Sequence, residues 1–336
     1  MKLAIDAMGG DYAPEAVVTG AILAASEYPD LTLLLTGNES QIRQYLGHSV
    51  PDNIEIIHTS EVIEAVDEPV RAVRRKKDSS MVVAANLVKE GRADGILSAG
   101  NTGALMTASL LIIGRLEGIE RPALATLWPT FDGRGVLVLD AGANMDATPE
   151  HLLQYAYMGH VYSQDVLLVE KPRIGLLNVG TEPGKGNQLT KTAFPMLAEG
   201  DFRFIGNVEA RDVMNGVCDV LVCDGFVGNA MLKLAEGIGL GLFGALKDVL
   251  LQNWMSKAAS LVLKPGLLKF KKTFDYKEYG GAPLLGVKGV VMKAHGSSNA
   301  RAIQMAIHQA RQFMLRDVLS QFVKVAGYKE HKMCNE

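Results

Sequence analysis

Short, continuously apolar segments that end in Gly, Asp or Asn recur along this chain and alternate with stretches of helical periodicity. Strands that are apolar on both faces are typical of parallel sheets that helices cover on both sides. The alternation therefore predicts an α/β fold, a Rossmann-like, mostly parallel sheet sandwiched by helices. The expected strands cover 2–6, 31–37, 95–100, 136–142, 173–180, 202–208 and 220–225. The expected helices cover 14–27, 79–91, 103–116, 149–163 and 228–251.

Composition and charge narrow the class of protein. With 336 residues, 48% hydrophobic and 21% charged, the chain has the balance of a globular protein with a large core. The net charge of −3 argues against nucleic acid as a partner. Three sparse cysteines favour a reducing compartment, and we expect Cys218 and Cys223 to be buried. The start of the chain reads as a first strand rather than a signal peptide, so we expect a cytoplasmic protein.

Polar residues gather where the expected strands end. In open α/β sheets, ligands bind beyond the carboxyl ends of the strands. One such residue would only cap a turn, but nine beside glycines indicate a polar cleft. The nine are Asp6, Asn101, Asp140, Asn144, Asn178, Glu182, Asn207, Asp224 and Asn229.

Glycine-rich loops follow several of these strands. Gly9 and Gly10 end the first strand and expose backbone N–H groups that suit an anion, with Pro14 at the next helix start. The loop after this first strand does not carry the G-x-G-x-x-G fingerprint of dinucleotide sites. In "SAGNTGA" we expect Thr102 to cap the helix that follows, and in "DGFVGNA" Gly228 lies at the next helix start.

The loop "NVGTEPGKGN" resembles a phosphate loop but lacks the Walker spacing, because Gly180 and Gly184 are separated by three residues. ATP binding is therefore not expected. Lys185 is a candidate phosphate ligand, and the alternative is a solvated loop lysine.

The stretch "AHGSSNA" places His295 close to Ser297 and Ser298, just ahead of a helical pattern. A nucleophilic serine needs a histidine within hydrogen-bond reach and usually a third orienting group. The stretch lacks the G-x-S-x-G elbow, so we expect the serines to act as helix cap and anion ligands. His295 serves as an acid, binds the anion, or only bonds the loop backbone.

Taken together, these blocks resemble the phosphate acyltransferase (PlsX) family of bacterial phospholipid synthesis. The matching blocks are DAMGGD, SAGNTGA, DAGAN, LLNVGTEPGKGN, GNVEARD, DGFVGNAMLK and YGGAPLLGVKGVVMKAHGSS, which run nearly from end to end. One departure is Ala210, where the family pattern leads us to expect glycine.

The resemblance implies a reaction in which acyl-[acyl carrier protein] and inorganic phosphate give acyl phosphate and free carrier protein. It also implies a fold similar to phosphotransacetylases and isopropylmalate dehydrogenases, with two lobes around a cleft. On this basis we expect one catalytic domain over 1–336, with two sublobes and a helical hairpin at about 235–275. It further implies a homodimer that contacts the membrane peripherally, with a downstream acyl-phosphate glycerol-3-phosphate acyltransferase. No metal or cofactor is expected.

That chemistry fits the residues. Phosphate is already a dianionic nucleophile near neutral pH, so the enzyme must mainly position it and stabilise an oxyanion. We therefore expect direct attack by phosphate rather than an acyl-serine. Lys185, Asn229 and His295 are the expected catalytic residues.

Two surfaces are candidates for partners. Arg71, Arg74, Arg75 and Lys76 form a basic cluster that either docks the acidic carrier protein or is only a solvated helix face. A second segment combines apolar residues at helical spacing with flanking lysines, as in helices that lie on anionic membranes. Its apolar residues are Trp254, Met255, Ala258, Leu261 and Val262. The alternative for this segment is a dimer-packing helix.

Two other functions compete with this interpretation. A nucleotide-linked dehydrogenase on the related fold would need a nicotinamide site and acidic metal ligands. No expected strand is followed by a G-x-G-x-x-G loop, and the sequence has no D-x-x-x-D run. A non-enzymatic adaptor between carrier protein and membrane would not need so many polar strand ends.

Overall fold

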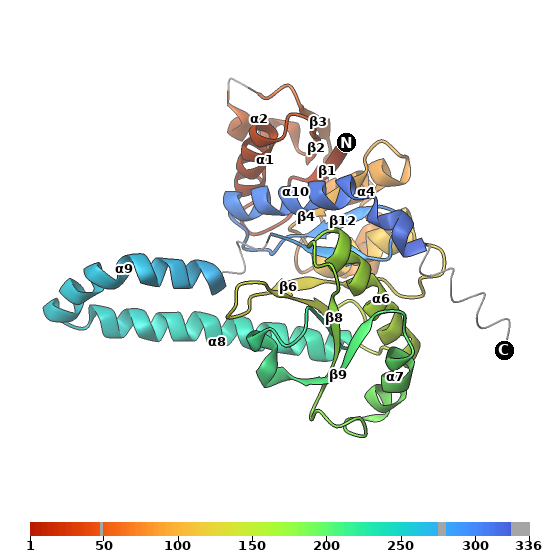
Figure 1. Ribbon diagram of the computed structural model, residues 1–336. Helices are drawn as coiled ribbons and strands as arrows, with labels where there is room; N and C mark the ends of the chain where they lie inside the picture. The colour runs from red at the N-terminus through yellow and green to blue at the C-terminus, as the bar shows by residue number, and fades with distance from the viewer. Residues whose placement is uncertain (48–49, 275–279, 324–336) are drawn as a thin grey trace.

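Two sheets form the framework of the computed structural model, which describes residues 1–47, 50–274 and 280–323 (Figure 1). The first sheet has seven strands in the order β3-β2-β1-β4-β12-β11-β5. Its strands are β1 (Lys2–Asp6), β2 (Thr32–Gly37), β3 (Ile54–His58), β4 (Gly95–Ser98), β5 (Ala123–Leu124), β11 (Ala282–Leu285) and β12 (Val290–Lys293). The five strands from β3 to β12 are parallel, and β11 and β5 extend the edge by antiparallel pairing.

The second sheet has five strands in the order β6-β7-β10-β8-β9. Its strands are β6 (Thr126–Trp128), β7 (Val136–Leu139), β8 (Arg173–Asn178), β9 (Arg203–Glu209) and β10 (Val220–Val222). All pairs are parallel except β6–β7. The mostly parallel α/β architecture expected from the sequence is therefore confirmed.

Helices cover both sheets. Around the first sheet lie α1 (Glu15–Glu27), α2 (Glu39–Leu46), α3 (Pro69–Arg75), α4 (Ser80–Lys89), α5 (Thr102–Ala108) with its π-helical extension η1 (Ser109–Ile113), and α10 (Ala300–Leu315). The second sheet carries α6 (Pro149–Asp165), α7 (Gln188–Ala198) and the 3-10 turn η2 (Ala210–Asn215). Ala210, the departure from the family pattern, begins η2.

The two lobes share one hydrophobic core. Its largest cluster of buried side chains joins Leu3 and Ile5 of the first sheet to Leu137 and Leu139 of the second. Tyr155 of α6 belongs to the same cluster and is fully buried. Cys218 and Cys223 are buried in a smaller cluster behind the second sheet, as expected.

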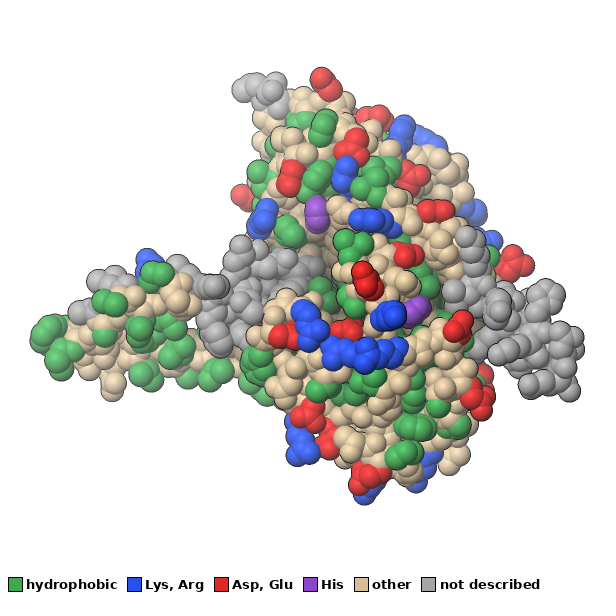
Figure 2. Space-filling view, viewed as in Figure 1, with side chains coloured by type: hydrophobic (Ala, Val, Ile, Leu, Met, Phe, Trp, Pro, Cys, Tyr) green, Lys and Arg blue, Asp and Glu red, His purple; other side chains and the backbone are tan. Residues whose placement is uncertain are grey.

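A hairpin of two long helices projects from this body (Figure 1). Helix α8 (Gly225–Leu251) leaves the end of β10, and α9 (Trp254–Phe274) returns alongside it. Figure 2 shows hydrophobic side chains along the projecting hairpin. Among the described residues, no helix combines the length and the apolar character that crossing a membrane would need.

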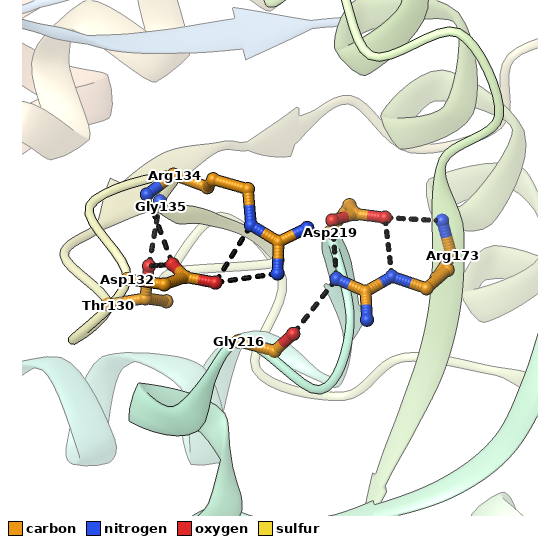
Figure 3. A network of polar contacts seen from close by, with 7 residues as sticks. All are labelled: Thr130, Asp132, Arg134, Gly135, Arg173, Gly216 and Asp219. Carbon is orange, nitrogen blue, oxygen red and sulfur yellow. Dashed lines mark hydrogen bonds and ion pairs between the residues drawn. The ribbon is translucent and has the colours of Figure 1, made fainter.

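An ion-pair network braces the amino ends of the second sheet's strands (Figure 3). Arg173, at the start of β8, donates two side-chain hydrogen bonds to Asp219 just before β10, at 2.9 and 2.8 Å. A third bond joins Arg173 to the carbonyl of Gly216 at 2.8 Å. In the neighbouring turn, Asp132 accepts from Thr130 and Arg134. The network fixes the strand starts, at the opposite end of the strands from the polar residues that the sequence predicts to form a cleft.

Candidate active site

The glycine loops after β1, β4 and β12 meet at the carboxyl edge of the first sheet. The Asp11 N–H donates to the Gly296 carbonyl at 2.8 Å, which ties the first loop to the last. Gly10 adopts φ +109°, a left-handed conformation, and a Cβ there would press against Ala99. A Cβ on Gly9 would collide with Asp6 and Gly100. The loops after β1 and β12, which lie almost 300 residues apart in the sequence, thus form one wall at the carboxyl edge of the first sheet. The position of polar residues at the strand ends predicts this arrangement.

Asp6 lies beneath this wall and is buried. Its carboxylate accepts hydrogen bonds from the hydroxyls of Ser80 and Ser98, both at 2.6 Å. Burial raises the pKa of Asp6, and these hydrogen bonds oppose the rise. Because hydroxyl groups of the protein already donate to both of its oxygens, Asp6 stabilises the loops at this edge of the sheet.

In the second sheet, Asp140 stabilises a loop through hydrogen bonds to its carboxylate, as Asp6 does in the first sheet. It is fully buried and accepts from the backbone N–H groups of Gly142, Ala143 and Asn144 at 3.1, 2.9 and 2.6 Å. Burial raises the pKa of Asp140, and the backbone donors oppose the rise. The carboxylate shapes the 141–144 loop, whose first two residues line the cavity described below.

Most predicted asparagines also hold loops in place. Asn101 caps α5 by accepting from the Ala104 N–H, and its amide donates to the carbonyls of Ala65 and Asp67. The predicted cap at Thr102 is therefore wrong by one residue, because Thr102 already has helical geometry. Likewise Asn299, not Ser297 or Ser298, caps α10. Asp224 caps α8, as its strand-end position suggests, by accepting from the Val227 N–H.

Two further predicted residues, Asn178 and Asn207, organise the loop before α7. Asn178 donates to the Lys185 carbonyl at 3.1 Å, and Asn207 donates to the Glu182 carbonyl at 2.8 Å. Asn207 is buried, and its side-chain oxygen has no partner among the described residues. The side chains of Glu182 and Lys185 are exposed and do not border the cavity described next. A phosphate-binding role for Lys185 stays a prediction.

A cavity of about 810 Å³ opens between the two sheets and reaches along α8. Its apolar part is lined by Leu127, Trp128, Phe131, Met214, Ile238 and Leu242, among others. Its polar part carries Thr102, Asn229, Lys233, Glu236, Lys293 and His295. Of the predicted site residues, Thr102, Asn229 and His295 are thus brought together at one cavity. This combination of a long apolar volume and a cationic end suits an amphiphilic, anionic substrate.

His295 and Ser297 do form a hydrogen-bonded pair. The His295 Nδ1 lies 2.9 Å from the Ser297 hydroxyl and also accepts the Ser297 N–H at 3.1 Å. The backbone donor makes Nδ1 an acceptor, so a neutral ring carries its hydrogen on Nε2. Partial burial lowers the pKa of His295, and the nearby Lys233 and Lys293 lower it further. Ser298 is buried, and its N–H bonds the His295 carbonyl.

Two cationic residues of the cavity were missed by sequence reasoning. Lys293 ends β12, and Lys233 lies one turn beyond Asn229 on α8, where it pairs with Glu236 at 2.8 Å. The signal for Lys293 was present, because residues i and i+2 of an extended segment point the same way. A candidate at His295 should have drawn attention to position 293.

The structure also gives the exposure of most residues in the two surfaces that were predicted to contact partners. Arg71, Arg74 and Arg75 are exposed on or at the end of α3, but Lys76 pairs with Asp67 at 2.6 Å. On α9, Trp254, Met255 and Val262 are exposed. The side chains of Ala258 and Leu261 lie outside the described residues.

Comparison with known proteins shows the family of the chain. A family model described as fatty acid synthesis protein matches residues 1–321. A phosphate acyltransferase of Brevibacillus brevis is 57% identical over 318 residues, 95% of each chain. Another, from Bacillus cytotoxicus, is 57% identical over 319 residues, 95% of this chain and 96% of that protein.

Solved structures share the fold at low sequence identity. A phosphotransacetylase from Streptococcus pyogenes superposes with a TM-score of 0.62 at 17% identity, covering 94% of both chains. The EutD phosphotransacetylase from Staphylococcus aureus gives 0.58 at 17% identity, covering 93% of this chain and 94% of that chain. A 4-hydroxythreonine-4-phosphate dehydrogenase from Klebsiella pneumoniae gives 0.53 at 14% identity, covering 94% of this chain and 99% of that chain. With the match to residues 1–321 and the relatives at 57% identity, the chain belongs to the fatty acid synthesis protein family and, within it, to the phosphate acyltransferases.

Proposed function

We propose that this protein transfers a long-chain acyl group from acyl carrier protein to inorganic phosphate, and that the acyl phosphate product serves phospholipid synthesis. The observation that carries the proposal is the cavity between the sheets. Its apolar part offers room for an acyl chain, and Lys293, Lys233 and Asn229 stand where the chain would meet an anion. A substrate that joins a long apolar chain to a charged reacting end matches both parts.

The reaction follows from the groups at the polar end. The phosphate dianion attacks the thioester carbonyl carbon, a tetrahedral oxyanion forms, and the C–S bond breaks to release the carrier thiol. The site's contribution is to hold the phosphate in line and to stabilise the oxyanion with N–H donors and cations. Asn229 supplies a neutral donor at this end of the cavity.

Carrier-protein docking is supported by where α3 lies. Pro69, the first residue of α3, packs so closely against Gly103 that a Cβ on the glycine would collide with its ring. Gly103 itself lines the cavity. The basic surface of Arg71, Arg74 and Arg75 thus stands beside the cavity mouth, where a docked acidic carrier would deliver its prosthetic arm. Lys76 contributes less charge to this surface, because Asp67 already pairs with it.

The hairpin supports peripheral contact with an anionic membrane. Trp254 and Val262 are 77% and 81% exposed on α9, next to exposed lysines at 257 and 264. An apolar helix face with flanking lysines binds anionic lipid surfaces. Since the acyl phosphate is itself amphiphilic, this contact would bring it to a membrane acyltransferase that uses glycerol 3-phosphate.

A homodimer is the proposed assembly. Helix α8 exposes Leu234, Ile238 and Leu242 at helical spacing, and a second copy of the chain would cover this apolar stripe. Ile238 and Leu242 also line the cavity, so the partner would close the acyl site on its open side.

The decisive experiment mixes the purified protein with long-chain acyl carrier protein and phosphate and follows free thiol. We expect thiol release that depends on phosphate, with acyl phosphate as the product by mass spectrometry. Thiol release without phosphate dependence, or none at all, would refute the proposal.

A further inference from the structure

We propose that Lys293 is a catalytic residue that carries a proton from the attacking phosphate to the departing sulfur. The inference rests on the proposed function, because it concerns the same cavity and the same reaction.

The proton balance of the reaction calls for such a group. Hydrogen phosphate enters as a dianion with one proton, and acyl phosphate leaves as a dianion with none. The P–O oxygen forms the new bond to the carbonyl carbon, and the C–S electron pair leaves with sulfur. Sulfur must then gain the proton that phosphate loses. An ammonium group between them can give its proton to sulfur and recover one from the phosphoryl oxygen.

The position of Lys293 suits this transfer. It ends β12, in register with Ser98 of β4, and its side chain lines the polar part of the cavity with that of His295. The Nζ group donates to the backbone carbonyls of Ala99 and Ala294. These neutral acceptors orient the ammonium group without neutralising it, and the loop after β4 supplies Thr102 to the same cavity.

Charged side chains of β1, of the loop after β1 and of α8 act on Lys293. Asp6 of β1 and Asp11 of the following loop attract the ammonium group, while Lys233 of α8 repels it. Asp6 is held from the other side by the hydroxyls of Ser80 and Ser98. The charges that act on the neighbouring His295 include Glu236 of α8, which pairs with Lys233. Among the residues that the structure describes, no ion pair joins Lys293 to a carboxylate.

The acidity of the group fits a proton carrier. Burial lowers the pKa of Lys293 to about 8, although Asp6 and Asp11 oppose the change. A general acid works best when its pKa lies near the working pH. His295 is less suitable as the acid, because partial burial lowers its pKa from an ordinary value that is already below neutrality.

Three variants test the role: Lys293→Met, Lys293→Arg and Lys293→Ala, measured by phosphate-dependent thiol release with acyl carrier protein. We expect Lys293→Met to lower kcat by about 10²–10⁴-fold, the usual contribution of a positioned acid. Lys293→Arg keeps the charge but holds its proton too tightly, so it should not restore the rate. Added alkylamine should raise the rate of Lys293→Ala by supplying the missing acid.

The pH profile separates proton transfer from simple charge. The acid form of Lys293 is the active one, so wild-type kcat should fall as pH rises through about 8. This alkaline limb should vanish in Lys293→Met and Lys293→Arg. Lys288→Met, an exposed lysine in the same β11–β12 hairpin, is the matched control and should keep both rate and profile.

Several outcomes would overturn the inference while leaving the proposed function intact. They are wild-type activity without an alkaline limb, an Arg variant as active as wild type, or a Met variant within tenfold of it. The wild-type profile decides the matter even if the variants fail to fold. If wild-type protein releases no thiol with phosphate, the proposed function itself fails.

Discussion

Gly228 shows how tightly a single residue is constrained where α8 begins beside the second sheet. A Cβ at this position would overlap the carbonyl oxygen of Asp140 and press on Cys223. We expect Gly228→Ala to destabilise the protein by about 2 kcal/mol or more, because neither backbone can yield cheaply. The start of α8 would shift, and Asn229 with it, so kcat should fall as well.

Gly237 of the same helix provides the matched control, since nothing lies within 4 Å of the position of its missing Cβ. Gly237→Ala should stabilise the protein by about 0.5–1 kcal/mol through helix propensity. Urea denaturation of both variants measures the two effects. Equal stability of Gly228→Ala and wild type would show that the close approach at Asp140 is unimportant.

Ser297 separates direct attack by phosphate from an acyl-serine intermediate. Its hydroxyl lies 2.9 Å from His295 Nδ1, a distance that suits a nucleophile pair. The same nitrogen also accepts the Ser297 N–H, which makes the pair a local turn contact. We expect Ser297→Ala to keep kcat within about tenfold of wild type, whereas loss of a true nucleophile costs up to about 10⁶-fold. A serine-bound acyl group found by mass spectrometry would reverse this view.

The strands and helices were largely predictable because burial on both faces leaves a strong sequence signal. All seven expected strands are present, from β1 to β10, and so are the five expected helices. The edge strands β3, β5 and β6 were missed; β5 and β6 have only two or three residues, too few to show periodicity. The paired strands β11 and β12 were quoted only as a motif.

The site was predictable in location but less so in its chemistry. The strand-end argument points to the edge of the sheets at which Thr102, Asn229 and His295 line one cavity, but most of the other predicted polar residues there bond the protein itself. Asp140 and Asn101 have their hydrogen bonds supplied by backbone groups that the sequence cannot place. The spacing of Lys293 from His295 could have placed both residues on one face, but the lowered pKa of Lys293 depends on burial, which only the fold reveals.

At the level of secondary-structure elements, the ion pair between Arg173 and Asp219 joins the starts of β8 and β10. Burial raises the pKa of Asp219, but the hydrogen bonds from Arg173 lower it by more, so the net shift is downward. We expect Arg173→Met to destabilise the protein by about 3 kcal/mol, since it leaves a mostly buried carboxylate without its partner. Arg43→Met, which breaks the exposed pair with Glu39, should cost less than about 1 kcal/mol.

The same pair predicts a pH dependence. A carboxylate whose folded pKa is depressed stabilises the fold above its unfolded value, near pH 4, and loses this contribution as pH falls further. The stability difference between wild type and Arg173→Met should therefore shrink below about pH 4. A difference that stays constant from pH 7 to pH 3 in urea titrations would contradict the assignment.

At the scale of the whole molecule, neither lobe forms the site alone. Thr102, Lys293 and His295 come from the first sheet's side, and Asn229 and Lys233 come from α8 after the second sheet. The same helix then continues outward as half of the projecting hairpin (Figure 1). One continuous element therefore joins the reacting end of the cavity to the surface proposed to meet the membrane.

That continuity leads to a prediction for Val262, which is 81% exposed on α9. Inserting a valine into the lipid interface is worth about 1.5–3 kcal/mol, so Val262→Glu should weaken vesicle binding about tenfold or more. Flotation with vesicles of anionic phospholipid measures the loss, and thiol release from acyl carrier protein should continue at the wild-type rate. Leu168→Glu, which charges an exposed leucine outside the hairpin, should float like wild type. If folded Val262→Glu protein floats as well as wild type, α9 does not contact lipid through this side chain, and dimer packing becomes the better account of its apolar residues.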